Sequence, residues 1–499
     1  MLKIQTKNNF FKYFCILTLI IIISFLISKT FLPAEDAAIL FRYSKNLALS
    51  GDITYNLGGE RVEGATDFLW MIVLSLFNKF NIDVFFSSIF IYLLSLFIII
   101  RVIQLNYILS FFETLVVIIF KLSLSQFLSS IFGFSILFLE LFLILNFIFF
   151  FKKKFFLLIF FSFIGCLIRP DFILFIIPMH IYNLFFFKKK KYFLYYFLFI
   201  LIGLFYFNWR YSYFGLLFPL PFYIKNQWLF FSNLQWGREI LIFIPILFIF
   251  NQIKFKDILN YKYIVIFFTF LIPTLYYANQ YLIQNTGNRF YFYISTCTLI
   301  FLLELRKDFF YKIKKTFILL LFIFSVSSVL FNVSHRYNSF NFITKNDNFY
   351  KIFDQLKHIE KENKMIIAVT EAGLIPYITD SYTYDLFGLN TKKFVKSPAS
   401  SNFIKNNSFD LIVLNSGHLG SNCSEFESTF SLKRKEYSDR NTTWFNFNLN
   451  LISGIDLNKY EVYLFNYPKL IFLNKNSINF KKIKSVFVEY GIQCKSKPA

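Results

Sequence analysis

The sequence predicts a polytopic α-helical membrane protein that ends in a soluble α/β domain. Its composition is the first observation, because 56% of the 499 residues are hydrophobic, 77 residues are Phe and the mean hydropathy is +0.53. The second is a series of long apolar stretches, since a helix of ~20 apolar residues crosses a bilayer. The third is a change after residue 333, where Asn, Lys, Ser and Asp become frequent. We therefore expect a membrane domain at 1–333 and an extracytoplasmic α/β domain at 334–499.

The apolar stretches predict about 11 to 13 transmembrane helices. The first stretch lacks a small-x-small cleavage site and is followed by further spans, so we interpret it as a retained helix and not as a secretion signal. The region 105–132 fits either one span or two short ones. The predicted spans lie near 13–31, 68–81, 84–101, 105–132, 134–151, 155–168, 171–187, 192–208, 239–251, 262–278, 290–304 and 316–333.

The formal charge of +23 is a topology signal and not a sign of nucleic-acid binding. The basic residues gather in short loops between spans, and such loops stay cytoplasmic. The loops at 32–67, 169–171, 209–238 and 279–289 must then face the other side. This predicts a multi-pass protein of the bacterial cytoplasmic membrane with its C-terminal domain outside the cytoplasm. The basic loop positions are Lys3, Lys7, Lys12, Lys152–Lys154, Lys188–Lys191, Lys254, Lys256, Lys262, Arg306, Lys307, Lys312, Lys314 and Lys315.

The first external loop begins with a predicted amphipathic helix. Pro33 suits a first helical turn, and Glu35 and Asp36 follow where the helix dipole favours negative charge. An apolar stripe follows at three- and four-residue spacing and comprises Ile39, Leu40, Tyr43 and Leu47. The other faces carry Arg42, Ser44, Lys45 and Asn46. We expect this helix to lie on the outer membrane surface.

The tail predicts a small α/β domain. The stretches 365–370 and 409–417 have the pattern of buried strands that end in turn residues, and 349–363 has helical spacing. Cys423 and Cys494 could pair there if the compartment oxidises thiols, and the sequence leaves this open. The four histidines and the cysteines show no zinc-ligand spacing.

Carboxylates at a membrane boundary suit group transfer from a lipid carrier. A positioned Asp or Glu can take the proton of an acceptor hydroxyl as it attacks. A leaving lipid phosphate needs cations, preferably the forked donors of arginine. Arg169, Arg210 and Arg289 all fall in predicted outward loops. One such arginine is more often only an interfacial anchor, but several together with an acidic pair favour function.

The motifs resemble those of a known family. The pair Glu35-Asp36 is followed by "FRYSKNLALSG" and "YNLGGERVEGATDFLW", and further matches are "RPD" (169–171), "WRYSYFGLLFPLPFYIK" (209–225), "NRF" (288–290) and "AVTEAGLIPYITDSYTYDLFGLN" (368–390). The chain thus resembles the GT-C superfamily of polyprenyl-phosphate-sugar-dependent glycosyltransferases. It is most similar to the group of terminal arabinofuranosyltransferases of the actinobacterial cell wall. The match is collinear over nearly the whole chain, and only its first motif is specific.

The resemblance implies a GT-C-like fold and sugar transfer, with a pentofuranose such as arabinofuranose as one candidate sugar. The donor would be a polyprenyl-phosphate sugar and the acceptor a cell-surface glycan. Asp36 would be the catalytic base, with Glu35 orienting the acceptor or a divalent cation. The family has two aspartates here, so Glu35 is a departure. An acidic residue that relatives carry beside the position of Gly133 is also missing.

The resemblance also implies substrate contacts. Arg42, Arg61 and Glu63 would order the first loop and line the sugar site. A local ion-pair cluster of Glu60, Arg61 and Glu63 is an equal alternative. The residues implied for the lipid phosphate and the rest of the substrate are Arg169, Asp171, Arg210, Tyr223, Lys225 and Arg289. The sequence requires no metal, and magnesium, manganese or calcium at the acidic pair stays open.

A transporter or flippase of lipid-linked sugars is the rival interpretation. Such a protein should carry polar residues at mid-membrane and a repeat that relates its halves. The span interiors appear in the sequence as nearly pure Phe, Leu and Ile, and no internal repeat is evident. Both observations favour the enzyme.

Overall fold

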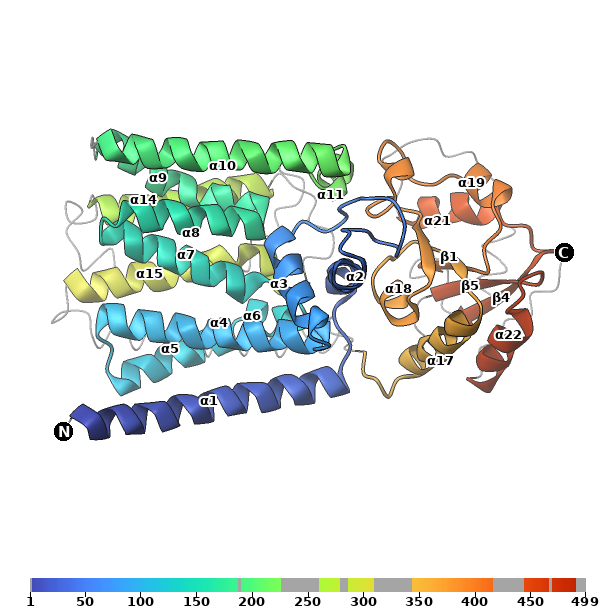
Figure 1. Cartoon of the computed structure of the whole chain (residues 1–499), viewed down its shortest axis with the longest axis horizontal. Coiled ribbons are helices and arrows are strands. Elements are labelled where there is room, and N and C mark those ends of the chain that lie inside the picture. The colour runs from blue at the N-terminus through green and yellow to red at the C-terminus, as the bar shows by residue number, and fades with distance from the viewer. Residues whose placement is uncertain are drawn as a thin grey trace. The chain divides into compact units, whose positions relative to one another are not determined.

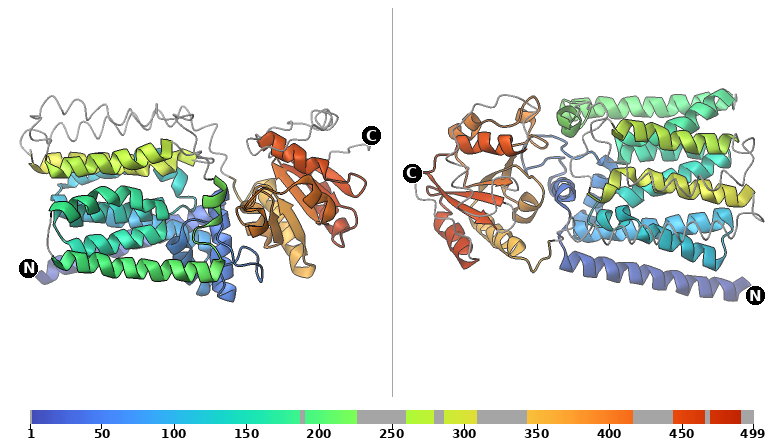
Figure 2. Two further views of the ribbon diagram at one scale, coloured as in Figure 1. Left: turned by 90° about the horizontal axis from the view of Figure 1, so that it is seen from above. Right: turned by 180° about the vertical axis from the view of Figure 1, so that it is seen from behind.

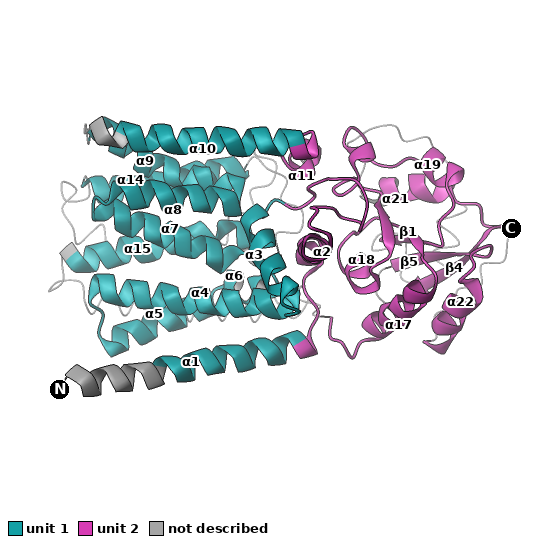
Figure 3. Ribbon diagram, in the orientation of Figure 1, with its two compact units in different colours: residues 1–28, 66–212, 226–341 teal, residues 29–65, 213–225, 342–499 magenta. Residues whose placement is uncertain are grey.

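The computed structural model describes residues 2–186, 190–225, 260–278, 286–308, 343–415, 444–465 and 469–490. The chain divides into two compact units (Figure 3). Unit 1 comprises residues 1–28, 66–212 and 226–341, and unit 2 comprises 29–65, 213–225 and 342–499. The first external loop thus belongs to the same unit as the C-terminal domain.

Unit 1 is a helical bundle (Figure 1). Within the described residues, four helical segments are long and apolar enough to span a membrane: Tyr13–Thr30, Val84–Tyr107, Phe193–Phe214 and Tyr261–Ala278. They match the spans predicted near 13–31, 84–101, 192–208 and 262–278. The predicted spans 239–251 and 316–333 lie outside the described residues, and 105–132 contains two helices. The helices are α1 (Leu2–Thr30), α3 (Phe68–Lys79), α4 (Val84–Tyr107), α5 (Phe111–Ser123), α6 (Ser125–Ser130), α7 (Ile136–Phe151), α8 (Phe155–Ile168), α9 (Ile173–Phe186), α10 (Lys190–Phe214), α14 (Tyr261–Ala278) and α15 (Phe292–Asp308), with 3-10 turns η1 (Pro170–Phe172) and η4 (Thr286–Tyr291).

The segment 68–81, predicted as a span, is shorter than a bilayer crossing. That segment forms α3, whose 12 residues extend only about 18 Å, whereas the hydrocarbon core is ~30 Å thick. An independent contact agrees. Arg306 at the end of α15 donates to the carbonyl of Tyr107 at the end of α4 and binds Glu113 of α5. The end of α4 therefore lies on the same side of the bundle as Arg306, which is predicted to be cytoplasmic. Since the loop before α3 is predicted to be external, α4 can end on the cytoplasmic side only if α3 does not cross.

The expectation of nearly apolar span interiors is wrong, and the clearest exception among the described residues is a buried ion pair. Lys121 of α5 and Glu140 of α7 form an ion pair, and both side chains are at most 4% exposed. Thr296 of α15 donates its hydroxyl to the same carboxylate oxygen of Glu140. Charges are tolerated inside a bundle when they are paired and hydrogen-bonded. The sequence did not reveal the pair because its members lie on different helices.

Unit 2 contains a five-stranded mixed sheet between helices (Figures 1 and 2). The order is β2-β1-β3-β5-β4, with β2–β1–β3 parallel and β3–β5–β4 antiparallel. The predicted strands 365–370 and 409–417 are confirmed as β1 (Ile366–Val369) and β3 (Leu411–Asn415), and the predicted helix 349–363 as α17 (Asn348–Glu362). The other strands are β2 (Tyr382–Asp385), β4 (Tyr460–Phe465) and β5 (Lys469–Asn474), and the other helices are α2 (Glu35–Ser50), α11 (Leu220–Lys225), α18 (Leu374–Thr379), α19 (Ser401–Asn406), α21 (Trp444–Ser453) and α22 (Phe480–Glu489).

Alternating side chains divide the core of unit 2 between the two faces of the sheet. Ile412 and Leu414 of β3 join a buried cluster with side chains of α19 and α21. Their neighbours in β3 point to the other face. There Tyr463 of β4 packs against Phe487 of α22, with ring centroids 4.9 Å apart. The strongly amphipathic helices α17 and α22 supply apolar stripes to this side.

Helix α2 begins at Glu35, two residues after Pro33, which was predicted to lie in its first turn, and most of its polar side chains are buried. Arg42, Ser44 and Asn46 are each at most 8% exposed. The helix packs against α18 of the α/β domain, and it ends at Gly51, which adopts a left-handed conformation at φ 76°. The polar positions of α2 therefore serve packing contacts within unit 2.

Candidate functional site

The acidic pair opens helix α2. Glu35 and Asp36 are partly buried in its first turn, where unpaired helix N–H groups favour negative charge. Glu35 Oε1 accepts a hydrogen bond from the N–H of Gly373 at 2.8 Å. Gly373 follows β1 in the segment "EAGLIPY". The tail motif therefore fixes the position of the acidic pair, although more than 300 residues separate them.

Gly373 is required by a close approach. A Cβ atom at this position would lie 2.0 Å from the carbonyl oxygen of Glu35. Only glycine lets the loop after β1 approach the start of α2 so closely. The glycine of this motif is thus explained by its close packing against the acidic pair.

Gly373→Ala should shift the start of α2 and destabilise unit 2 by about 1–3 kcal/mol, because the added methyl meets backbone atoms that cannot yield easily. The midpoint of thermal unfolding in detergent is the measurement. Gly203→Ala in α10 is the matched control, since nothing lies within 4 Å of its added Cβ. An unchanged midpoint for Gly373→Ala would show that the approach is looser than described.

Arg42 joins three segments of unit 2. Its guanidinium donates to the carbonyls of Tyr55, Pro376 and Ser381 at 2.6, 2.5 and 2.6 Å, and to Asn56 Oδ1 at 2.8 Å. It also stacks over the Tyr55 ring at 4.7 Å. Burial lowers the pKa of Arg42. With its donors committed to protein acceptors, this geometry favours a structural role over direct substrate binding.

A second connection runs through Tyr43. Its hydroxyl accepts from the N–H of Gly64 at 2.9 Å and donates to Asn390 Oδ1 at 3.1 Å. Asn390 in turn donates to Asp385 Oδ2 at 2.8 Å. Gly64 has no room for a side chain, because a Cβ would lie 1.9 Å from Asn390 Oδ1. The first-loop motif and the "DLFGLN" motif therefore pack directly on one another.

Asp385 should titrate in the mildly acidic range. Burial raises its pKa from 3.8 to about 6, although N–H groups of Asn390, Gly388 and Phe387 donate to it. The folded state holds the proton of Asp385 more tightly than the unfolded state. As the pH rises from 4 to 6, the free energy of unfolding should therefore fall by up to about 3 kcal/mol, and above pH 6 it should level off.

Asp385→Asn tests this titration. It removes the titrating group and places an amide N–H₂ opposite N–H donors. The gap in unfolding midpoint between the wild type and Asp385→Asn should be largest near pH 4 and shrink as the pH rises through 6. A gap that is constant with pH would contradict the assignment.

Glu60 and Arg61, which the sequence placed in a possible ion-pair cluster with Glu63, both contact residues outside that triplet. Arg61 pairs instead with Asp52 at 2.9 Å and stacks over Tyr213 at 4.6 Å. Glu60 Oε1 accepts from the N–H of Lys392 at 2.8 Å. Glu63 is 3% exposed, and its carbonyl accepts from the N–H of Leu220. The loop is therefore ordered mainly by contacts outside the triplet.

A polar cluster that the sequence analysis missed lies where β1 and β3 end. Glu371 follows β1, and it pairs with Lys469 at the start of β5 and accepts from Asn415 at the end of β3. Lys469 also interacts electrostatically with Glu35. The carboxyl ends of β1 and β3 form the switch point of this strand order, which is where open α/β sheets commonly bind ligands. Only the strand pairing brings these residues together.

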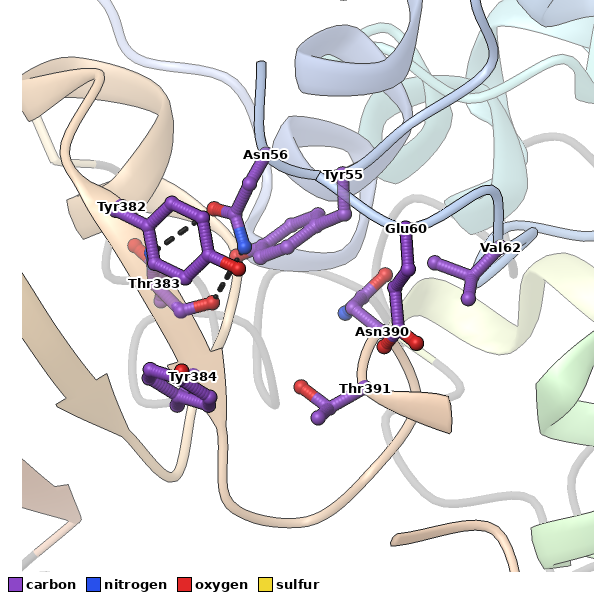
Figure 4. Close-up of a pocket in the computed structure, with 9 residues that line it drawn as sticks. All are labelled: Tyr55, Asn56, Glu60, Val62, Tyr382, Thr383, Tyr384, Asn390 and Thr391. Atoms are coloured by element: carbon purple, nitrogen blue, oxygen red, sulfur yellow. Dashed lines mark hydrogen bonds between the residues drawn. The ribbon is translucent and has the colours of Figure 1, made fainter. Parts of the chain in front are cut away.

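A pocket lies between the first loop and β2 (Figure 4). It has about 270 Å³ of empty space, including its open side. We call it the loop–strand pocket. Its lining residues are Tyr55, Asn56, Glu60, Val62, Tyr382, Thr383, Tyr384, Asn390 and Thr391.

Unit 1 brings two of the predicted arginines together. The guanidinium of Arg169 lies 4.9 Å and that of Arg289 lies 5.2 Å from the centroid of the Phe290 ring. Arg169 is held by Asp171 through two hydrogen bonds of 3.0 and 2.6 Å, and Asp171 also accepts from Tyr277 at 2.5 Å. We call Arg169, Asp171, Tyr277, Arg289 and Phe290 the arginine cluster.

Further groups lie around the arginine cluster. Arg289 stacks over Phe134 at 3.8 Å, and Asp67 acts electrostatically on Arg169. The sequence analysis missed Tyr277, Phe134, Phe290 and Asp67 as members of this site. The motifs "NRF" and "EGATDFLW" already contain Phe290 and Asp67, so these two could have been found.

The remaining predicted residues lie elsewhere in their units. Arg210 of unit 1 is 3% exposed and donates to the Tyr206 hydroxyl at 3.1 Å. Tyr223 and Lys225 belong to α11 of unit 2, where the Tyr223 hydroxyl accepts from the N–H of Phe218 at 3.4 Å. Glu35, Asp36, Arg42, Arg61 and Glu63 share unit 2, whereas Arg169, Asp171, Arg210 and Arg289 share unit 1. Across the described ranges, no group of three His, Cys, Asp or Glu side chains is arranged to hold a metal ion. Cys423 and Cys494 lie outside those ranges.

Comparison with known proteins supports the fold. Residues 347–463 match a domain of unknown function, DUF8728, and no curated protein matches. Two crystal structures of ArnT from Cupriavidus metallidurans, one apo and one bound to undecaprenyl phosphate, each align at a TM-score of 0.57 and 10% identity. The alignments cover 94% of this chain and 98% of ArnT. The chain therefore has an ArnT-like fold, with several apolar helices and a small C-terminal sheet domain.

Proposed function

We propose that the protein is an integral-membrane glycosyltransferase that moves a sugar from a polyprenyl-phosphate donor to a cell-surface glycan. The observation that carries the proposal is a partly buried acidic pair, fixed at the start of α2 by Gly373, in a chain with a GT-C-like fold. That one of the similar ArnT structures holds undecaprenyl phosphate supports a lipid phosphate as the carrier.

The arginine cluster is the proposed site of the donor phosphate. Two guanidinium groups beside one aromatic ring offer fixed, forked donors to a phosphate. Asp171 orients Arg169 and leaves it charged, as a positioning partner should. When the sugar leaves, negative charge grows on the phosphate, and pre-oriented cations stabilise it without reorganisation.

Asp36 is the proposed catalytic base. It would take the proton of the acceptor hydroxyl as that oxygen attacks the anomeric carbon, while the bond from this carbon to the phosphate oxygen breaks. Glu35 is held by the N–H of Gly373 and so serves to position the pair and the acceptor. A divalent cation at the pair would act through the same carboxylates.

The motifs support a finer assignment. The stretches "FRYSKNLALSG" and "YNLGGERVEGATDFLW" are similar to those of terminal arabinofuranosyltransferases, and they belong to unit 2 up to residue 65. A pentofuranose is therefore the sugar we propose first. The basic residues in alternate loops support a site and a C-terminal domain on the extracytoplasmic side of the cytoplasmic membrane.

A lipid-linked sugar transporter is the rival function, and the buried Lys121–Glu140 pair is the observation in its favour. The two functions separate in detergent, where no compartments exist. The purified protein should transfer sugar from a polyprenyl-phosphate-sugar fraction to an acceptor glycan there, releasing polyprenyl phosphate. A transporter would leave donor and acceptor unchanged in that assay.

Arg289→Met should lower transfer by about 10- to 100-fold, because it removes one cation from the leaving phosphate. The loss should appear in kcat, since charge grows mainly in the transition state. Arg101→Met is the matched control, because Arg101 of α4 contacts the side chains of Gln104 and Tyr13. Equal activity of the two variants would remove Arg289 from the proposed site.

A further inference from the structure

We infer that the loop–strand pocket binds one neutral sugar residue of the acceptor glycan. This inference rests on the proposed function, because it takes the bound sugar to be part of the acceptor. The pocket has its own lining within unit 2 and does not include the acidic pair (Figure 4). It would therefore select the acceptor without taking part in the chemistry.

The charge of the lining selects against anions. Glu60 is the one residue among the nine that is ionised at neutral pH, and neither Lys nor Arg is among them. The nearby Lys392 directs its ammonium to the carbonyl of Phe214 at 3.0 Å. A phosphate would meet a carboxylate without a compensating cation, whereas hydroxyl groups can donate to that carboxylate.

The mouth of the pocket has the two kinds of group that a sugar ring needs. Tyr382 and Tyr384 lie on the same face of edge strand β2, with ring centroids 5.6 Å apart, and Tyr382 is 40% exposed. Such rings present an apolar face and a polar hydroxyl to a ligand. Glu60 uses Oε1 for the N–H of Lys392, and its Oε2 has no partner among the described residues. Aromatic faces can thus pack on the C–H groups of a sugar while Glu60 accepts from its hydroxyls.

The pocket is preorganised. Asn56 donates to the carbonyl of Thr383 and accepts from its N–H, both at 2.9 Å, which fixes the loop against β2. Tyr384 is held between Phe403 and Phe409, with centroids 5.7 and 5.8 Å away. Since these groups are already ordered, binding of a sugar requires little further loss of conformational freedom.

The test is saturation-transfer NMR on the full-length protein in detergent. The probes are methyl α-arabinofuranoside, methyl α-mannopyranoside and, as the anionic probe, mannose 1-phosphate. At least one methyl glycoside should bind saturably in the millimolar range, and mannose 1-phosphate should bind more weakly than methyl α-mannopyranoside. Glu60→Gln and Tyr382→Ala should each weaken the binding about tenfold. Glu60→Gln keeps an oxygen for the N–H of Lys392, so the loop should stay in place.

Controls separate this inference from the proposed function. Glu362→Gln removes an exposed carboxylate that pairs with Lys482 in the same unit and should leave sugar binding unchanged. In transfer assays, Glu60→Gln should raise the acceptor KM with little change in kcat. The inference would be overturned by a lack of saturable binding up to about 50 mM, by wild-type affinity in the Glu60→Gln and Tyr382→Ala variants, or by a preference for the phosphate. If transfer nevertheless occurs with wild-type protein, the proposed function stands without this pocket.

Discussion

Asp36→Asn is expected to reduce sugar transfer by about 10²–10⁴-fold, the usual contribution of a general base. Asparagine has nearly the same size and can still accept a hydrogen bond, but it cannot take the proton of the acceptor hydroxyl. Asp36 lies in the first turn of α2, so the substitution should leave the helix in place. The measurement is kcat for transfer by purified protein, together with the unfolding midpoint of the same sample.

Two variants serve as controls for Asp36→Asn. Asp36→Glu keeps the carboxylate but places it one methylene farther from the backbone. This variant should therefore retain part of the activity. Glu35→Gln keeps an oxygen for the N–H of Gly373 and should lose less activity than Asp36→Asn. The assignment of the base would be wrong if Glu35→Gln were the more damaging of the two changes at equal protein levels.

Arg42→Met should destabilise unit 2 by about 3–5 kcal/mol. The substitution leaves the carbonyls of Tyr55, Pro376 and Ser381 without their donor, and each buried unsatisfied group costs ~1–3 kcal/mol. Arg42→Lys should rescue little of this, because one ammonium cannot reach four acceptors in the geometry of a guanidinium. Thermal unfolding in detergent and limited proteolysis of the first loop measure the effect.

Lys45→Met is the matched control on the same helix. Lys45 pairs with Asp380 at 2.6 Å, but the two side chains are 23% and 44% exposed, so the pair should contribute less than about 1 kcal/mol. If Arg42→Met unfolded no earlier than Lys45→Met and instead lost substrate affinity, Arg42 would be a substrate ligand and not the structural centre of unit 2.

The sequence predicts those elements whose signals are local. The start of α2 follows from Pro33 and the acidic first turn, and strands β1 and β3 follow from short apolar runs that end in turn residues. The burial of Arg42 does not follow in this way, because its acceptor Pro376 is 334 residues away. Polar residues of α2 that look solvated in the sequence are in fact packed against a distant domain.

The same reason explains the site residues. Arg169 and Arg289 are predicted as separate candidates, but their meeting at Phe290 depends on helix packing. The Lys121–Glu140 pair and the Glu371–Lys469 pair were missed because each joins two elements whose own patterns are apolar. The length of α3 was overestimated because an apolar run does not state where a helix ends.

Mass spectrometry of surface glycans tests the central claim most directly. Cells that lack the gene should be compared with cells that carry the wild type or Asp36→Asn at equal membrane levels. We expect the same glycan residue to be missing in the deletion strain and in the Asp36→Asn strain, and to return with the wild type. A glycan from the Asp36→Asn strain that matches the wild type would contradict catalysis by this carboxylate.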